Sequence, residues 1–317
     1  MHISEGFLPP AHAIGWTLAS APFVVQGFRA VKKHLDERPE DKVTIASAGA
    51  FAFVLSAMKI PSVTGSSSHP TGVGLGTVLL KPKVMTALGS IVLLFQALLL
   101  AHGGLTTLGA NIFSMAVAGP WASWFIFRTL SRTGLALSVA GGIACGLGAL
   151  STYCVTATQL AFAHPDITSG FLGSLVKFLG IFAITQVPLA VTEGVVSGYV
   201  LRWLSSRSTI DVSTLTGARP EKAVRSRSSW ILLAGLLLMI AAPLAAHSRS
   251  LFTGSDNRGT EAISKVDPGY KKWFSSIWTP SGSVESFLFA MQAALGAGLV
   301  GYVVGSRRQS KRDSVPT

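Results

Sequence analysis

Long apolar runs separated by short polar stretches are the main pattern of this 317-residue chain. A helix needs about 20 predominantly apolar residues to cross a bilayer, and fewer where it is buried among neighbours. The segments that meet this requirement are 12–29, 43–59, a short 70–80, 84–101, 111–127, 134–162, 171–201, 229–246 and 283–305. The pattern predicts an all-α polytopic membrane protein with a seven-span bundle followed by two further transmembrane helices.

Basic residues mark the loops on one side of the predicted membrane. They gather in 29–42, at Lys81 and Lys83, at Arg128 and Arg132, in 202–227 and in 307–312. Because cytoplasmic loops are enriched in Lys and Arg, we expect an extracytoplasmic N-terminus and a cytoplasmic C-terminus in the cell (inner) membrane. If segment 70–80 were a re-entrant loop, most of these basic runs would lie outside, so we count it as a crossing.

The composition agrees with a membrane location. Hydrophobic residues make up 49% of the chain and charged residues 13%, which is too apolar for a soluble globular protein of this length. A formal net charge of +12 would suggest nucleic-acid binding in a soluble chain. Here the basic residues follow the predicted topology, so we expect no nucleic-acid partner.

The start of the chain concentrates nitrogen donors. The Met1 amine, the His2 backbone amide and the His2 imidazole can chelate one ion in a plane and leave a fourth position open. His69 lies in the small-residue segment TGSSSHPTG, which the topology places on the same side as Met1. A planar set of nitrogens favours Ni(II), Cu(II) or Co(II) over magnesium and calcium, which prefer oxygen.

Two histidines this far apart are a weak signal compared with a local zinc motif. The alternative is that His2 belongs to a flexible terminus and His69 to a surface loop. The other histidines on the outer side are His12, His102, His164 and His247. His12 or His102 could line an entry path, but we place none of the four among the ligands, and we expect no resident cofactor.

Charged residues within predicted spans are candidates for function because they are costly in a membrane. Lys177 falls in the outer half of the seventh span and Glu193 in its cytoplasmic half. Buried carboxylates usually have a partner. We therefore expect Glu193 to pair with a basic group of a neighbouring helix or of a partner protein, rather than to serve in a proton relay.

Several motifs, in order, resemble the CbiM family, the substrate-capture component of energy-coupling factor ABC importers of cobalt and nickel. They are MHISEGFLPP, VTGSSSHPTGVGLGTVLL, LLLAHGGLTTLGANIFSMAVAGP and VTEGVVSGYVL. The C-terminal part is similar to CbiN, the two-span auxiliary subunit of the cobalt systems. The resemblance implies a CbiM-like metal-capture domain at 1–203, a basic cytoplasmic linker at 204–228, a CbiN-like two-span domain with an extracytoplasmic loop at 229–306, and a basic cytoplasmic tail at 307–317.

The family holds its metal through the N-terminal amine, the second-residue histidine and a histidine after the second crossing, which correspond to Met1, His2 and His69. The CbiN-like part implies cobalt as cargo, for cobalamin biosynthesis, whereas the nitrogen-rich donor set keeps nickel as the alternative. The sequence has no G-x-x-x-x-G-K-S/T phosphate loop. We therefore expect no enzyme activity in this chain, and a CbiQ-like transmembrane coupling protein and a CbiO-like ATPase as partners.

Two other classes of function compete with this interpretation. A channel or secondary transporter could move metal without ATP, but the sequence shows neither an inverted repeat nor a series of intramembrane carboxylates. An intramembrane enzyme would need a nucleophile with a base, or a motif such as H-E-x-x-H, and the sequence has neither.

The loop at 247–283 of the CbiN-like part has two possible roles. Its acids, with Glu285 just beyond it, could form a metal reservoir, or its aromatic residues could seat the N-terminal arm. We favour seating, because the acids lack ligand spacing and clustered Trp and Tyr commonly anchor a loop at a membrane interface. The acids are Asp256, Glu261, Asp267 and Glu285, and the aromatic residues are Tyr270, Trp273, Phe274 and Trp278.

Overall fold

The computed structural model describes residues 2–57, 60–61, 66–207 and 253–313. Met1, His247 and the predicted crossing 229–246 lie outside these residues. The helices are α1 (Pro10–Glu37), η1 (Pro39–Asp41), α2 (Lys42–Ala57), α3 (Val73–Leu80), α4 (Pro82–Leu99), α5 (Leu108–Asn111), the π-helical η2 (Ile112–Ala118), α6 (Gly119–Ser131), α7 (Leu137–Ala163), α8 (Gly170–Arg207), α11 (Ser255–Val266) and α12 (Gly282–Asp313).

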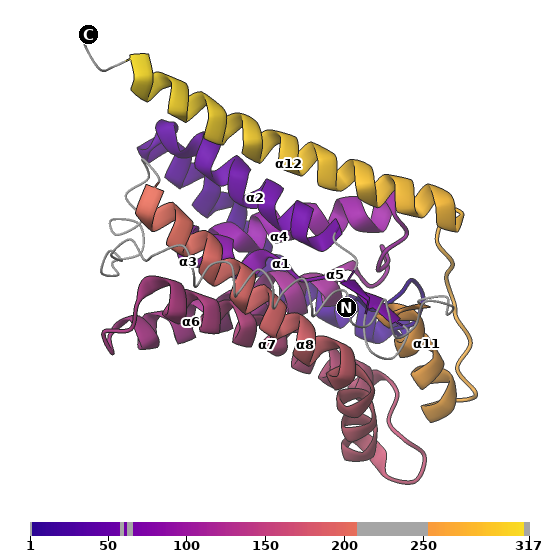
Figure 1. Cartoon of the computed structure of the whole chain (residues 1–317). Coiled ribbons are helices and arrows are strands. Elements are labelled where there is room, and N and C mark those ends of the chain that lie inside the picture. The colour runs from indigo at the N-terminus through magenta and orange to yellow at the C-terminus, as the bar shows by residue number, and fades with distance from the viewer. Residues whose placement is uncertain (1, 58–59, 62–65, 208–252, 314–317) are drawn as a thin grey trace.

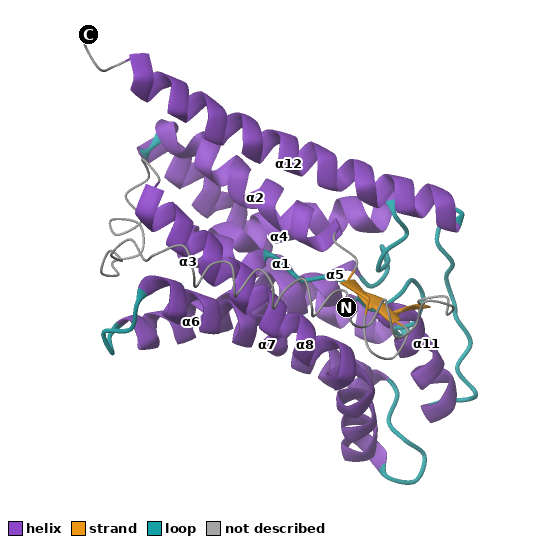
Figure 2. Ribbon diagram, viewed as in Figure 1, coloured by secondary structure: helices purple, strands orange, loops and turns teal. Residues whose placement is uncertain are grey.

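Three short strands complete the described structure. They are β1 (Ile60–Pro61), β2 (Ser66–Ser68) and β3 (Thr253–Gly254). Strand β2 lies between the other two, antiparallel to β1 and parallel to β3. The N-terminus, the strands and α11 lie toward one end of the helices, and the C-terminus lies at the other end (Figures 1 and 2). We call residues 2–9, which precede α1, the arm, and this end of the molecule the arm end.

The described structure is mostly helical, with three short strands that the all-α prediction did not include, and it agrees with a polytopic membrane protein; the count of nine crossings is not confirmed. Among the described residues, the helices long and apolar enough to cross a membrane are Pro82–Leu99, Leu108–Ser131, Leu137–Ala163 and Gly170–Ser205. Helix α3 has eight residues, or about 12 Å, against a hydrocarbon core of about 30 Å. Segment 70–80 is therefore not a membrane-length helix.

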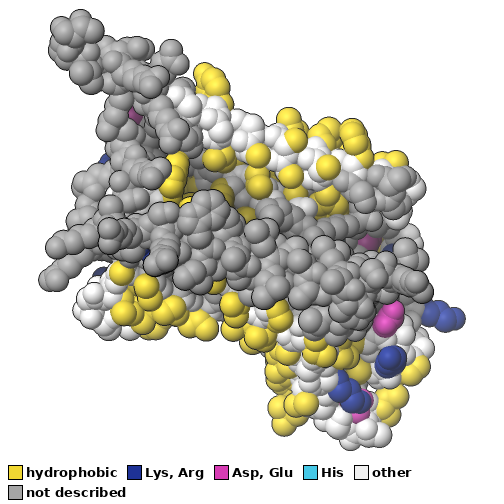
Figure 3. All heavy atoms as spheres, viewed as in Figure 1, with side chains coloured by type: hydrophobic (Ala, Val, Ile, Leu, Met, Phe, Trp, Pro, Cys, Tyr) yellow, Lys and Arg dark blue, Asp and Glu magenta, His cyan; other side chains and the backbone are white. Residues whose placement is uncertain are grey.

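Exposed apolar side chains cover the flanks of the described helices, as expected of a surface that faces lipid. Leu172 and Val176 of α8 are each 69% exposed, and Phe287 and Leu295 of α12 are each 65% exposed. On the face drawn in Figure 3, hydrophobic side chains spread along the helices and charged ones gather at the arm end. Lipid surrounding these flanks explains an apolar surface that would be unusual in a soluble monomer.

Glycines let α7 and α8 pack closely. A Cβ atom at Gly142 would lie 2.8 Å from the carbonyl oxygen of Gly194, and one at Gly194 would lie 2.8 Å from that of Gly142. Small residues of this kind allow helix backbones to approach in membranes, where van der Waals contact drives association. Residues of both helices, among them Leu160 of α7 and Phe178 of α8, lie in the same buried apolar cluster as Ile3 and Leu8 of the arm.

Glu193 of α8 contacts the chain that leads into α3. Its carboxylate accepts hydrogen bonds from the Thr71 N–H at 2.6 Å, the Thr71 hydroxyl at 2.6 Å and the Gly72 N–H at 3.0 Å. The prediction of a basic partner for Glu193 is therefore wrong for the described residues. Donors at the N-terminus of a helix satisfy the carboxylate instead. Because His69 lies two residues before Thr71, Glu193 also positions the loop of a predicted ligand.

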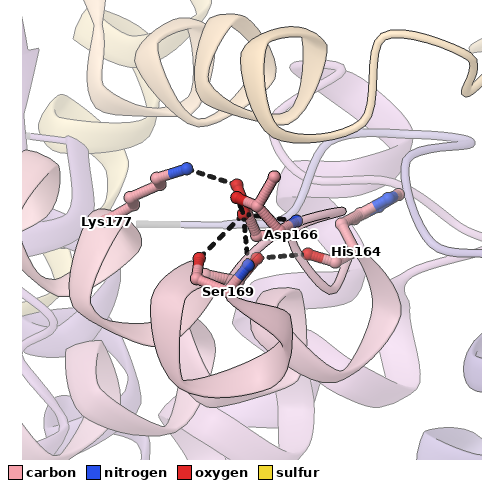
Figure 4. Close-up of polar contacts among 6 residues, drawn as sticks. His164, Asp166, Ser169 and Lys177 are labelled. Carbon is pink, nitrogen blue, oxygen red and sulfur yellow. Dashed lines mark hydrogen bonds and ion pairs between the residues drawn. The ribbon is translucent and has the colours of Figure 1, made fainter.

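Lys177 of α8 has a structural partner in the α7–α8 loop. Its ammonium pairs with the carboxylate of Asp166, which also accepts bonds from Thr168 and Ser169 (Figure 4). The Lys177 ammonium and the Ser169 and Thr168 donors lower the pKa of Asp166. The loop is therefore closed by an ionised carboxylate, and the described contacts of Lys177 belong to this turn.

Replacing the Glu193 carboxylate with an amide tests its structural role. Glu193→Gln presents an NH₂ group to donors that need an acceptor, so we expect a loss of about 1–3 kcal/mol from the unmet buried bonds. Thermal unfolding of the purified protein in detergent should show a lowered Tm. Glu37→Gln, at an exposed residue of α1, is the matched control. Equal Tm values for the two variants would show that the carboxylate does not hold this loop.

Candidate metal centre

Three histidines from distant parts of the chain meet at the arm end. One ring nitrogen of each of His2, His69 and His102 lies within 4.8 Å of the other two. The ring centroids are 5.2 Å apart for His2–His69, 4.4 Å for His2–His102 and 4.9 Å for His69–His102. Among the described residues, these three histidines form a cluster that could hold a metal ion.

The His69 ring has a fixed tautomer. Its Nδ1 lies 3.0 Å from the Pro70 carbonyl oxygen, which can only accept, so Nδ1 bears the proton and Nε2 carries the lone pair. A hydrogen bond from the second ring nitrogen is the usual way in which proteins orient a metal-binding histidine. His69 follows directly on β2, and its side chain is 4% exposed.

His2 is buried, with 3% of its surface exposed. Burial lowers the pKa of its imidazole well below 6.5, and the nearby His102 ring lowers it further. A lowered histidine pKa means that the ring stays neutral as the pH falls through 6.5. The neutral ring is the form that binds metal.

Side chains between α4 and η2 hold the arm directly after His2. The Ile3 N–H donates to Asn111 Oδ1 at 2.8 Å, and the Ile3 carbonyl accepts from Asn111 Nδ2 at 3.1 Å and from the Thr107 hydroxyl at 2.7 Å. Asn111 thus pairs with both backbone groups of Ile3, as a neighbouring strand would. Because an unpaired buried backbone group is costly, these bonds favour a single path for the arm.

Glu5 fixes the next part of the arm. Its buried carboxylate accepts from the Leu105 N–H at 2.6 Å, the Thr106 N–H at 2.8 Å and the Thr106 hydroxyl. The same hydroxyl accepts from the Gly6 N–H at 3.1 Å. The two chains approach so closely that a Cβ atom at Gly104 would lie 2.5 Å from Glu5 Cα. Only glycine fits there, which explains one of the two glycines after His102.

Three consecutive carbonyls at the end of the arm each accept a hydrogen bond from a ring-bearing side chain. We call these contacts the carbonyl clamp. The pairs are Gly6 with Tyr270 at 2.9 Å, Phe7 with His164 at 2.8 Å and Leu8 with Trp273 at 2.7 Å. Two of the three donors come from the C-terminal region of the chain.

His164, at the end of α7, links the clamp to the bundle. Its Nε2 contacts the Phe7 carbonyl and its Nδ1 lies 3.1 Å from Asp267 Oδ2. The two ring nitrogens of His164 thus join the arm to the C-terminal region. Tyr270 packs edge-on against this ring at 4.7 Å. His164 therefore lies outside the histidine cluster, as expected, but it is a structural residue of the arm rather than a bystander.

The C-terminal region also reaches the His69 loop. Strand β3 pairs with β2 through Ser66 with Thr253 and Ser67 with Gly254. Ala262 and Ile263 of α11 join Ile3, Leu8, Phe178 and Phe182 in one buried apolar cluster. This region thus contacts both chain segments that hold predicted ligands.

The structure brings together two of the three predicted ligands, His2 and His69, while Met1 lies outside the described residues. His102, which we did not place among the ligands, joins them. His12 belongs to α1 and is not part of the cluster. In the sequence, His102 stands directly before two glycines, which allow close packing of chain segments, and shortly before Thr106 and Thr107.

Known proteins resemble both parts of the chain. The family model described as the cobalt uptake substrate-specific transmembrane region matches residues 2–209, which is more than half of the sequence. The chain belongs to the CbiM family. The model for the cobalt transport protein component CbiN matches residues 226–315, so the chain is a fusion of a CbiM-like region with a CbiN-like region.

Curated relatives of the CbiM region are cobalt transport proteins by name. The cobalt transport protein CbiM of Streptomyces coelicolor is 56% identical over 230 residues, which cover 71% of this chain and 99% of the relative. That of Acetoanaerobium sticklandii is 57% identical over 197 residues, 62% of this chain and 81% of the relative. A solved structure titled as a truncated transition metal transporter is 26% identical, with a TM-score of 0.55, and covers 64% of this chain and 98% of its own.

The arm can be loosened without touching a histidine. Asn111→Asp keeps the acceptor for the Ile3 N–H but loses the donor to the Ile3 carbonyl and adds a buried charge. Losing a buried hydrogen bond costs about 1–3 kcal/mol, so we expect the arm to open on the order of tenfold more often. The rate at which an aminopeptidase trims the purified protein measures this opening. Ser131→Ala, at the far end of α6, is the control, and equal trimming of both variants would contradict the role of Asn111.

Proposed function

We propose that this chain is the substrate-specific membrane component of an energy-coupling factor ABC importer for Co²⁺, and that it supplies cobalt for cobalamin biosynthesis. The supporting observation is the buried His2–His69 pair at the end of an arm whose backbone is hydrogen-bonded along residues 3–8. In this proposal the ion is held by the Met1 amine, the amide and imidazole of His2, and the His69 Nε2.

Similarity to known proteins favours cobalt as the transported ion. Relatives of the CbiM region are named cobalt transport proteins, and the C-terminal region matches the cobalt component CbiN. Four nitrogens in a plane also suit nickel. A nickel importer component of the same class is therefore the alternative, and competition between the two metals for the purified protein distinguishes them.

The chain works with partners in this proposal. The arm end faces the extracytoplasmic side, so the metal is captured outside, and the C-terminus lies in the cytoplasm, in agreement with the basic loops. A CbiQ-like coupling protein would transmit movement from a CbiO-like ATPase, while this chain has no catalytic role of its own. Cobalt uptake that persists without any ATPase partner would favour an ATP-independent channel or secondary transporter instead.

The CbiN-like region seats the arm rather than storing metal. Tyr270 and Trp273 hold the carbonyls of Gly6 and Leu8, and β3 pairs with the strand before His69. Of the predicted reservoir acids, Asp267 contacts His164 and Glu261 is exposed on α11. The structure does not describe the side chains of Asp256 and Glu285.

An N-terminal extension gives the first test of the metal site. One extra residue before Met1 replaces its amine with an amide that cannot close the same chelate ring, so we expect metal binding to be lost while the protein stays folded. Equilibrium dialysis with cobalt measures binding, and a tag after Thr317 is the matched control. His2→Ala and His69→Ala should also lose binding. His34→Ala should keep it, because the His34 ring on α1 contacts Asp41 of η1. Full binding by the extended protein would refute the proposed ligand set.

Loss of one clamp bond tests the seating role. Trp273→Phe keeps an aromatic ring but removes the N–H that reaches Leu8. A net hydrogen bond contributes about 0.5–1.5 kcal/mol, so we expect cobalt uptake by cells with the partner proteins to fall about 2- to 10-fold. Trp278→Phe makes the same change elsewhere in the loop and should have little effect. Unchanged uptake with Trp273→Phe, together with a loss in Glu261→Gln, would favour the reservoir instead.

A further inference from the structure

His102 stands where a further donor to the metal would stand. Its Nε2 is 2.8 Å from the His69 Nε2, and its ring is 4.4 Å from that of His2. Two nitrogens at adjacent positions around one ion, each with a bond of about 2.0 Å, are about 2.8 Å apart. The two Nε2 atoms therefore already have the spacing of neighbouring ligands.

A direct hydrogen bond joins the two rings at this distance. The His69 Nδ1 bears the proton, so His102 donates its Nε2–H to the His69 Nε2 lone pair. A metal on His69 takes that same lone pair and ends the bond. With its proton moved to Nδ1, the neutral His102 ring offers an Nε2 lone pair to the ion, and its charge does not change.

The orientation of the rings indicates which position His102 would occupy. The His2 imidazole belongs to the chelate plane of the proposed site. An imidazole that binds along the axis perpendicular to this plane must itself lie at nearly 90° to it. The His102 ring is tilted by 66° from the His2 ring, whereas the His69 ring is tilted by 33°. His69 thus suits a position in the plane, and His102 suits the axis.

Neighbouring groups hold the His102 ring in this orientation. Its backbone N–H donates to the Gln96 carbonyl at 3.2 Å, which continues the end of α4. The Phe289 ring of α12 packs edge-on against it, with centroids 5.6 Å apart. Phe289 is buried with Ala57 and Leu100, so the ring cannot swing freely toward lipid.

We propose that His102 is an axial fifth ligand of the transported metal and that it favours cobalt over nickel. This inference rests on the proposed metal site. Low-spin Ni(II) with four planar nitrogens has a filled orbital along the axis, which repels a fifth donor. Low-spin Co(II) has a single electron there and gains a bond from one axial nitrogen. The same ring that disfavours nickel therefore stabilises cobalt.

Electron paramagnetic resonance of the full-length protein, loaded with Co(II) without oxygen, tests the ligand. The wild-type spectrum should show splitting by one axial nitrogen, and labelling with ¹⁵N-histidine should turn each triplet into a doublet. This measurement needs no variant. His102→Ala and His102→Gln should abolish the splitting, and His34→Ala should retain it. A wild-type spectrum without axial nitrogen would overturn the proposal.

Competition between Co(II) and Ni(II) for the same proteins tests selectivity. The ratio of bound cobalt to nickel should fall about tenfold or more in His102→Ala, the effect typical of losing a group that supports a metal site. An unchanged ratio in His102→Ala, with binding lost in His2→Ala, would refute the axial ligand and leave the proposed function standing. Undiminished binding in His2→Ala would refute the proposed metal site itself.

Discussion

The backbone of the arm must find hydrogen-bond partners inside a protein whose flanks face lipid, and the arm end is organised around this requirement. The arm is not helical, so few of its own N–H and C=O groups bond to one another, as the Phe7 N–H does to the Ser4 carbonyl. Residues 3–8 therefore depend on side chains from other elements: Asn111 and Thr107 at Ile3, Thr106 at Gly6, and the carbonyl clamp at the end of the arm. One of these partners, His164, lies at the end of α7, and Ile3 and Leu8 pack with residues of α7 and α8 in a buried apolar cluster.

This arrangement removes the usual mobility of a chain end. The first residues of most domains are poorly ordered unless something ties them down. Here the residue after His2 is paired on both backbone groups, so the imidazole is held in place before any ion arrives. Binding then has less conformational freedom to freeze, which favours affinity. His69 gains the same advantage from Pro70 on its ring and from Glu193, which holds the loop two residues further on.

The sequence predicted what depends on local pattern and missed what depends on distant partners. Apolar runs located α4, η2 with α6, α7 and α8, because hydrophobicity and helix length are properties of single segments. They failed at α3, where only eight residues of the apolar run are helical. Glu193 was expected to need a positive charge, yet donors of Thr71 and Gly72, 122 and 121 positions away, satisfy it. No local pattern in the sequence indicates that partner. His102 looked like an interfacial residue because its neighbours, His2 and His69, are remote in the chain.

The origin of the clamp has a consequence for assembly. Tyr270, Trp273 and strand β3 belong to the CbiN-like region, which continues on the same polypeptide as the region that holds the histidines. Two separate proteins would dock to an extent set by their amounts in the membrane. A covalent connection replaces those amounts with an effective concentration that reaches the millimolar range for short flexible linkers. Every copy of the arm is thus synthesised with its own seating partner in a fixed one-to-one ratio, whatever the level of expression.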